Sequence, residues 1–104
     1  MGRRKPRIYR VKVEELEIWY TDRIINHIAK HNVRIDEVIT ALAEGKKIYL
    51  RLKKGKDWVA IVKHPYSGRY LTVFLEKTGK HEFRLKTARD STKVERRLFK
   101  RRYS

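Results

Sequence analysis

Arginine residues surround the point, close to the C-terminal end, where an alternating apolar pattern changes to a helical one. Arg84 lies within the predicted strand, Arg89 lies where that strand ends, and Arg96 lies in the first turns of the predicted helix. Guanidinium groups beside the free N–H groups of a helix N-terminus are well suited to bind phosphate. Arg84 and Arg89 are therefore the predicted phosphate ligands. The alternative for each is a solvated cation or a contact with a partner protein.

His31 is the main candidate for acid–base chemistry, because an imidazole titrates close to neutral pH. The alternative is a histidine that interacts with the dipole and last carbonyl groups of its own helix. His27 and His31 are four residues apart, a spacing that can chelate a metal ion, but no third ligand accompanies them. We therefore expect neither a metal site nor a cofactor. His64 and His81, next to predicted turns, are weaker acid–base candidates.

The charge of the chain is segregated. The 104 residues carry a net charge of +16, and residues 46–104 hold nineteen basic and five acidic side chains. Residues 14–45 hold three basic and seven acidic side chains. Because a one-sided distribution indicates a surface that faces a polyanion, nucleic acid is the expected partner. An acidic protein partner and simple solubility are the alternatives.

Aromatic and basic side chains are interleaved at predicted outward positions, an arrangement typical of proteins that stack unpaired bases and hold their phosphates. The candidate RNA contacts are Lys30, Arg51, Tyr70, Lys86 and Arg96. The alternative is that a protein partner or the terminal helix covers this surface.

Length and composition predict one domain over residues 11–104, preceded by a flexible basic arm at residues 1–10. The absence of cysteine excludes disulfides and thiol chemistry. No apolar run is long enough to span a bilayer, and no signal peptide is evident, so we expect a cytoplasmic protein without membrane contact. The absence of glutamine favours a thermophilic source.

The periodicity predicts an α+β fold, a helical hairpin packed on a four-stranded or five-stranded antiparallel sheet, with a basic C-terminal helix. The two hairpin helices are expected at 22–31 and 35–44, separated by a left-handed Asn32. The four strands are expected at 47–53, 58–63, 69–76 and 81–88, with a weaker one within 11–20.

Three further expectations concern individual faces and the last helix. In the first of the four strands, Ile48, Leu50 and Leu52 should point inward and Tyr49 and Arg51 outward. In the last strand, Phe83, Leu85 and Thr87 should share one face, with Glu82, Arg84, Lys86 and Ala88 on the other. Thr92 and Glu95 fit a capping box for a helix whose apolar positions are Val94, Leu98 and Phe99.

The order of elements and several short strings resemble the BrnT toxins of type II toxin–antitoxin modules, which are distant relatives of the RelE and ParE toxins. The resemblance covers roughly residues 18–100. Its positions in the N-terminal half are Trp19, Arg23, Lys30, His31, Val33 and Asp36-Glu37-Val38. In the C-terminal half they are Gly68-Arg69-Tyr70-Leu71, Arg84, Ala88-Arg89 and Glu95-Arg96.

The resemblance implies a RelE-like fold, an endoribonuclease that inhibits translation, and a small antitoxin that neutralises it. RNA cleavage without a metal would use the adjacent 2′-hydroxyl as nucleophile, with Arg84, Arg89 and His31 as the catalytic candidates. Phe99 stands where the family has tyrosine, so no role of that phenol carries over to this chain. The other departures are Tyr20 for Asp, His27 for Asn and Asn32 for Gly. A non-enzymatic nucleic-acid-binding module is the alternative function.

Overall fold

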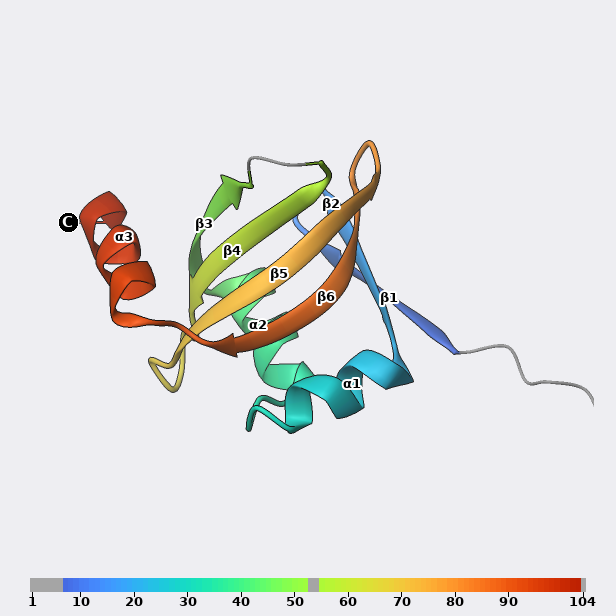
Figure 1. Ribbon diagram of the computed structural model, residues 1–104, viewed down its shortest axis with the longest axis horizontal. Helices are drawn as coiled ribbons and strands as arrows, with labels where there is room; N and C mark the ends of the chain where they lie inside the picture. The colour runs from blue at the N-terminus through green and yellow to red at the C-terminus, as the bar shows by residue number, and fades with distance from the viewer. Residues whose placement is uncertain (1–6, 53–54, 104) are drawn as a thin grey trace, which may run out of the picture.

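The computed structural model describes residues 7–52 and 55–103, and within them the chain forms three helices and one six-stranded sheet (Figure 1). The strands are β1 (Ile8–Val13), β2 (Leu16–Thr21), β3 (Lys46–Arg51), β4 (Asp57–Lys63), β5 (Tyr70–Gly79) and β6 (Glu82–Asp90). The helices are α1 (Asp22–Ala29), α2 (Ile35–Glu44) and α3 (Lys93–Tyr103). The predicted α+β class is confirmed. All four strands expected after residue 46 are present, with ends within three residues of those predicted.

The sheet has the order β1-β2-β6-β5-β4-β3, and it is mixed rather than antiparallel. Strands β3 to β6 form the predicted antiparallel meander. The prediction is wrong at β2, which pairs with β6 in parallel. Because the meander alternates, β6 runs in the direction opposite to β3. Whether β6 is parallel to β2 therefore depends on the direction in which the chain enters β3 after the two helices, and no local turn signal specifies that direction.

An N-terminal hairpin adds two strands where the sequence predicted at most one. The segment Ile8–Arg10, assigned to a basic arm, lies in β1, whereas residues 1–6 of that arm lie outside the described residues. The hairpin turns at Glu14, whose φ of 57° is left-handed. Such a turn normally carries Gly, Asn or Asp, so the sequence offers no turn signal here.

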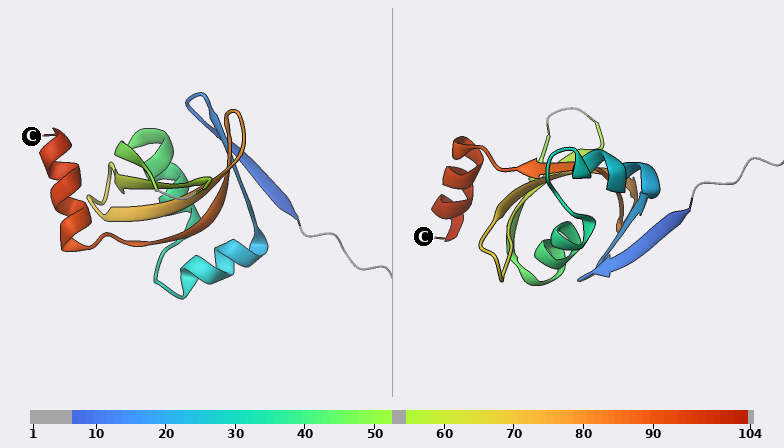
Figure 2. Two further views of the ribbon diagram at one scale, coloured as in Figure 1. Left: turned by 45° about the horizontal axis from the view of Figure 1, so that its top comes forward. Right: turned by 90° about the horizontal axis from the view of Figure 1, so that it is seen from below.

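Helices α1 and α2 follow the predicted boundaries closely, and Asn32 between them has the expected left-handed φ of 58°. Figure 2 shows α2 inside the concave side of the curved sheet, whereas α1 lies across one end beside β6. The two helices therefore form a hairpin in sequence, but each packs largely against strands.

Two apolar cores lie on opposite faces of the sheet. The larger core fills the space between the concave face and helices α1 and α2, and it includes Ile18, Ile28, Leu42, Val62, Leu71 and Leu85. The smaller core lies under α3 and contains Ile48, Val59, Ile61 and Phe99. A helix on each face explains why β4 is apolar on both sides.

The predicted inward face of β3 and the predicted apolar face of α3 are each confirmed only in part, because Ile48 and Phe99 are buried but the other apolar positions are not. Tyr49 packs against the larger core and Ile48 against α3, while Leu50 and Leu52 are exposed. In α3 the buried residue is Phe99, at 3% exposure, whereas Val94 is 63% exposed. Local periodicity could not identify the faces of β3, because each side of the strand packs one residue against a core, Ile48 on one side and Tyr49 on the other.

A β-bulge at Lys86 reverses the alternation of β6. Phe74 pairs with Thr87 and Leu75 with Leu85, so Lys86 has no partner residue on β5. The buried side chains of β6 are therefore Phe83, Leu85 and Ala88. The prediction placed Thr87 on this face and Ala88 on the other, and the structure shows the reverse. Arg84 and Arg89, an odd number of residues apart, consequently share a face.

Replacing Phe99 with alanine should detach α3. We expect the free energy of unfolding to fall by about 3–5 kcal/mol, because the ring fills the smaller core and contacts Tyr70 and Tyr103. Val94→Ala, on the exposed side of the same helix, should change it by less than about 0.5 kcal/mol. Urea unfolding of both variants tests this, and equal losses would contradict the assigned helix face.

Candidate nucleic-acid interface

The sheet face on which α3 packs is only partly covered. Helix α3 lies over β3 and β4, so the middle of the face remains accessible along β5, β6 and β2 (Figure 1). We call this area the open face, and its residues are Trp19, Phe74, Arg84, Lys86 and Arg89. It combines aromatic rings with cations, and the Arg89 guanidinium lies 5.2 Å from the centre of the Phe74 ring. The face thus has the chemical character of a surface that binds unpaired bases.

Every cation of β6 on the open face is paired with a carboxylate. Arg84 Nε donates to Glu76 Oε1 over 3.0 Å. Lys86 Nζ lies 3.2 Å from Asp57 Oδ1. In each of these two pairs at least one side chain is more than a third exposed to solvent. Each pair therefore stabilises the fold only weakly, and a phosphate can compete with the carboxylate for the cation.

The third pair, Arg89 with Glu95, is stronger because it is bidentate and partly buried. Arg89 Nη1 and Nη2 donate to the two Glu95 oxygens over 2.8 and 2.9 Å. Glu95 also accepts the Thr92 N–H over 2.7 Å and the hydroxyl of the buried Thr72 over 2.9 Å. The Glu95 N–H donates to Thr92 Oγ1 over 3.2 Å, which confirms the predicted capping box. Arg89 therefore fastens α3 to the sheet.

These contacts change the acidity of two carboxyl groups. Burial raises the pKa of Glu95, but the Arg89 guanidinium and the Thr92 and Thr72 hydrogen bonds outweigh it and lower the pKa to about 2. The pKa of Asp90 is lowered mainly by its hydrogen bond from Arg69. Both groups are ionised at neutral pH, so the junction between β6 and α3 is less cationic than its arginine content indicates.

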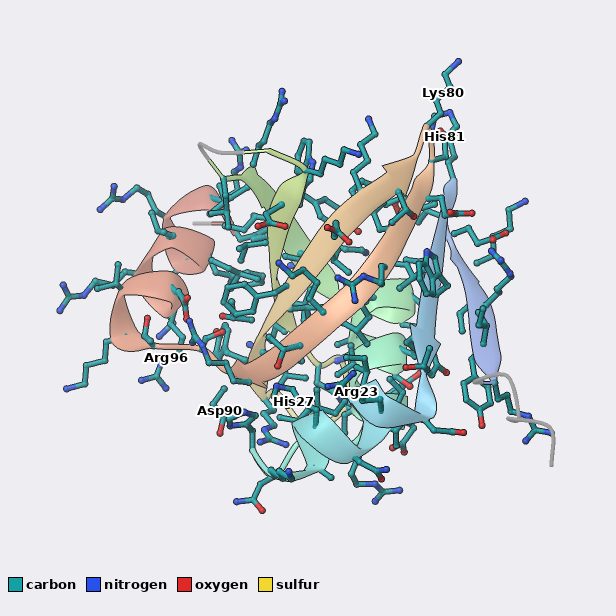
Figure 3. The ribbon with its side chains drawn as sticks, turned by 45° about the vertical axis from the view of Figure 1, so that its right-hand side comes forward. Arg23, His27, Lys80, His81, Asp90 and Arg96 are labelled. Atoms are coloured by element: carbon teal, nitrogen blue, oxygen red, sulfur yellow. The ribbon has the colours of Figure 1, made fainter. Side chains whose placement is uncertain are left out.

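A groove beside the open face holds cations without such partners. Arg23, Asn26, His27 and Lys30 form one stripe of α1, and they line a hollow of about 440 Å³ together with Ile24 and Lys86. We call this the α1 groove. Figure 3 shows Arg23 and His27 on α1 alongside β6. Among the described residues, Arg23 and Lys30 form no ion pair, so their charges are available to a ligand.

The predicted site residues are only partly brought together. Lys30 and Lys86 meet in the α1 groove, and Arg84 lies next to it on β6. His31 does not line the groove, but its ring meets that of His27 edge-on, with 5.5 Å between their centres. His81 lies at the far tip of the β5–β6 hairpin (Figure 3).

The remaining candidates lie elsewhere. Arg51 is at the end of edge strand β3, and Arg96 is on α3 near Asp90. Tyr70 packs edge-on against Phe99 beneath α3, with the amino groups of Lys63 and Lys100 over its ring. These three residues do not line the α1 groove, so the structure does not bring all the predicted RNA contacts together.

Sequence reasoning did not assign ligand contacts to Arg23, Asn26 and His27. A signal for them exists, because residues 23, 26, 27 and 30 recur at the spacing of one helix face, opposite the apolar positions. What could not be read from the sequence is that this polar stripe lies against Lys86 of β6.

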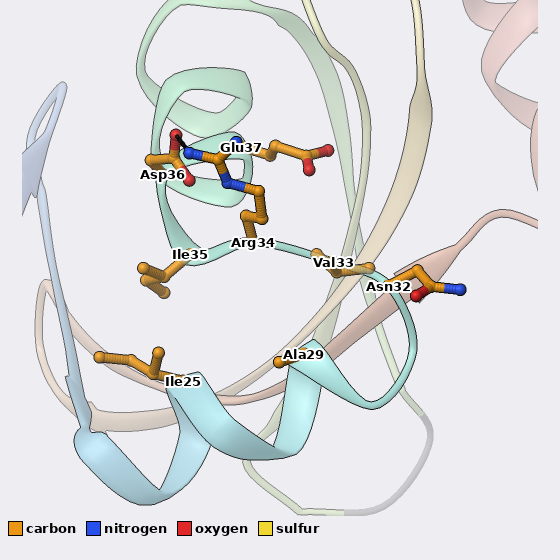
Figure 4. Close-up of a pocket in the computed structure, with 8 residues that line it drawn as sticks. All are labelled: Ile25, Ala29, Asn32, Val33, Arg34, Ile35, Asp36 and Glu37. Carbon is orange, nitrogen blue, oxygen red and sulfur yellow. Dashed lines mark hydrogen bonds and ion pairs between the residues drawn. The ribbon is translucent and has the colours of Figure 1, made fainter.

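A further hollow lies between α1 and α2 (Figure 4). Its floor is apolar, with Ile25 and Ile35 facing each other, and its charged groups already have partners. Arg34 bonds Asp36 over 3.1 Å, and Glu37 accepts from Arg69 over 2.7 Å. It offers no unpaired cation and is not part of the candidate interface.

The described residues contain no cluster of three or more potential metal ligands, and none of their helices is long and apolar enough to cross a bilayer. No family model, curated protein or solved structure matches the chain. The BrnT resemblance and the RelE-like fold that it implies therefore stay predictions.

Glu95 should make stability depend on pH. Its folded pKa of about 2 lies below the ordinary 4.5, so its contribution is complete above pH 4.5 and is lost as the pH falls toward 2. Urea unfolding should show Glu95→Gln less stable than the wild type by on the order of 2 kcal/mol at pH 7, after allowance for solvent screening.

Most of the difference should be lost by pH 2, where about half of the wild-type Glu95 carboxyl groups are protonated. Glu17→Gln, which removes an exposed pair with Arg10, should cost less than about 1 kcal/mol at any pH. A Glu95→Gln difference that stays constant from pH 7 to pH 2 would contradict the role of this carboxylate.

Proposed function

We propose that this protein binds single-stranded RNA in the α1 groove and across the open face, and that it is a toxin-like endoribonuclease of the kind the BrnT resemblance implies. The observation that carries the proposal is the convergence of Arg23, His27 and Lys30 on Lys86 in one hollow. Neither Arg23 nor Lys30 has a carboxylate partner among the described residues. A phosphate can therefore bind them without displacing an existing ion pair.

Binding would extend from the groove onto β6. Lys86 borders both surfaces, and Arg84 is two residues away on the same face. Their exposed pairs with Asp57 and Glu76 exchange readily for phosphate contacts, because such pairs contribute little in water. Arg89 would exchange Glu95 for a phosphate less readily, since the attachment of α3 depends on its hydrogen bonds to Glu95.

The chemistry would be attack of the 2′-hydroxyl on the adjacent phosphorus. One imidazole of the His27–His31 pair would take the 2′-hydroxyl proton, and the other would protonate the leaving 5′-oxygen as the phosphorus–oxygen bond breaks. Lys86 and Arg23 would stabilise the charge on the phosphorane oxygens. The products are a 2′,3′-cyclic phosphate and a 5′-hydroxyl.

The alternative is RNA binding without cleavage, and one observation favours it. Phe99 occupies the position of the family tyrosine, and it is 3% exposed between Tyr70 and Tyr103. No hydroxyl at residue 99 can assist the reaction in this chain. Without that hydroxyl, the side chains that could contribute to cleavage are the histidines and the cations.

The proposal includes a small antitoxin that covers the cationic surface. Its charge complementarity would come from acidic side chains facing Arg23, Lys30 and Lys86, which RNA would otherwise contact. Covering the α1 groove would be sufficient to exclude RNA.

Affinity for RNA should fall steeply with salt. With about four phosphates neutralised, the slope of log K against log salt should be near −2.8, or roughly fifty-fold between 50 and 200 mM. Arg23→Gln and Lys30→Gln should each reduce the slope by about 0.7, as fluorescence anisotropy with labelled RNA can measure.

Arg34→Gln is the matched control for this measurement, because Arg34 pairs with Asp36 away from the groove and should leave the slope unchanged. Salt-independent binding, or an equal effect of all three substitutions, would count against the α1 groove.

Cleavage should survive EDTA and leave 2′,3′-cyclic phosphate ends, while RNA with a 2′-deoxyribose at the cut should resist. His27→Gln and His31→Gln should each slow cleavage about 10²- to 10⁴-fold because each removes a proton-transfer group. His81→Gln, at the distant hairpin tip, should be inert. Loss of activity in EDTA, or 5′-phosphate products, would disprove this mechanism, and RNA binding with no cleavage would support the alternative.

Co-expression with the product of an adjacent short reading frame should yield a complex of defined mass in light scattering. The complex should bind RNA at least tenfold more weakly than the free protein, because the groove is covered. An absence of complex would argue against the antitoxin proposal while leaving RNA binding in place.

A further inference from the structure

A second hollow adjoins the α1 groove. It encloses about 470 Å³ and is lined by Trp19 to Ile24 and by Arg84. We call it the Trp19 hollow. It shares Arg23 and Ile24 with the α1 groove, so one guanidinium borders both spaces. A ligand that places a charged group in the groove can therefore place a neighbouring group in the hollow.

The Trp19 ring is held in place by hydrogen bonds outside the hollow. Its Nε1 donates to Thr78 Oγ1 over 3.0 Å, and that hydroxyl donates to Glu82 over 2.9 Å. Trp19 also lies beside Arg84 in the parallel register of β2 and β6. A half-buried indole with its orientation fixed is a stacking surface that loses little conformational entropy on binding.

The acidic residue among those that line the hollow is Asp22. Asp22 accepts the Tyr9 hydroxyl at Oδ1 over 2.8 Å, which leaves further lone pairs for a ligand. A carboxylate accepts hydrogen bonds from the amino group of cytosine, and adenine and guanine also carry amino groups. Uracil has none. The wall of the hollow therefore favours bases that carry an amino group.

We propose that the Trp19 hollow binds one unpaired, amino-bearing base of the RNA whose phosphate lies in the α1 groove. The base stacks on Trp19, its amino group donates to Asp22, and Arg23 contacts the phosphate between the two spaces. This inference rests on the proposed RNA binding. It adds a base preference at a defined subsite.

The test uses labelled U6 and the same hexamer with one uridine replaced by cytidine. The wild type should bind the cytidine-containing hexamer about fivefold or more tightly. Trp19→Leu should weaken binding of that hexamer about 5- to 150-fold, the range for a lost stacked base, at an unchanged salt slope. Trp19→Phe, which keeps an aromatic ring, should restore most of the affinity.

Asp22→Asn should reduce the preference for cytidine, because the amide can also donate to uracil O4. In a Trp58→Phe background, where Trp19 is the remaining tryptophan, the cytidine-containing hexamer should quench the fluorescence. This readout needs no substitution at Trp19 itself.

Two failures can be told apart. If neither hexamer binds, the proposed RNA binding is wrong. If both bind with the expected salt slope but Trp19 is not quenched, or Trp19→Leu binds within twofold of the wild type, the base subsite is wrong and RNA binding stands.

Discussion

The β-bulge at Lys86 determines the chemical character of the surface. In a regular strand, residues five apart point to opposite faces, so Arg84 and Arg89 would be separated by the sheet. The extra residue restores them to one face and adds Lys86 between them. It also turns Ala88 into the core, where a larger or charged side chain would not fit. Both the cationic open face and the packing of β6 depend on this irregularity.

Collecting cations on one face has an electrostatic cost, and the fold offsets it with carboxylates from three other elements. Asp57 on β4, Glu76 on β5 and Glu95 on α3 each neutralise one β6 cation. The Arg89–Glu95 pair also anchors α3, so the charge of Arg89 mainly stabilises the fold. Next to β6, the described cations Arg23 and Lys30 of α1 have no such partner, which is why we expect phosphate contacts at the border between α1 and β6.

Features encoded by neighbouring residues could be predicted from the sequence, and features that depend on distant pairing could not. The boundaries of α1 and α2, the left-handed Asn32 and the capping box at Thr92 are local, and they are confirmed. The parallel pairing of β2 with β6 and the ion pair of Lys86 with Asp57 join segments far apart in the chain. The partners of Arg84 and Arg89 are only eight and six residues away, but the register of β5 with β6 and the turn into α3 decide that they face these side chains. For the same reason, a basic residue in a predicted strand indicated a charge but not whether a carboxylate would face it.

The proposed RNA-binding surface is the α1 groove and the adjoining part of β6. The most direct measurement is amide chemical-shift mapping by nuclear magnetic resonance as an RNA hexamer is added. We expect the largest shifts at Arg23, His27, Lys30 and Lys86, with little change around the hollow between α1 and α2. Shifts concentrated at Arg34 and Glu37, or confined to the outer face of α3, would contradict it.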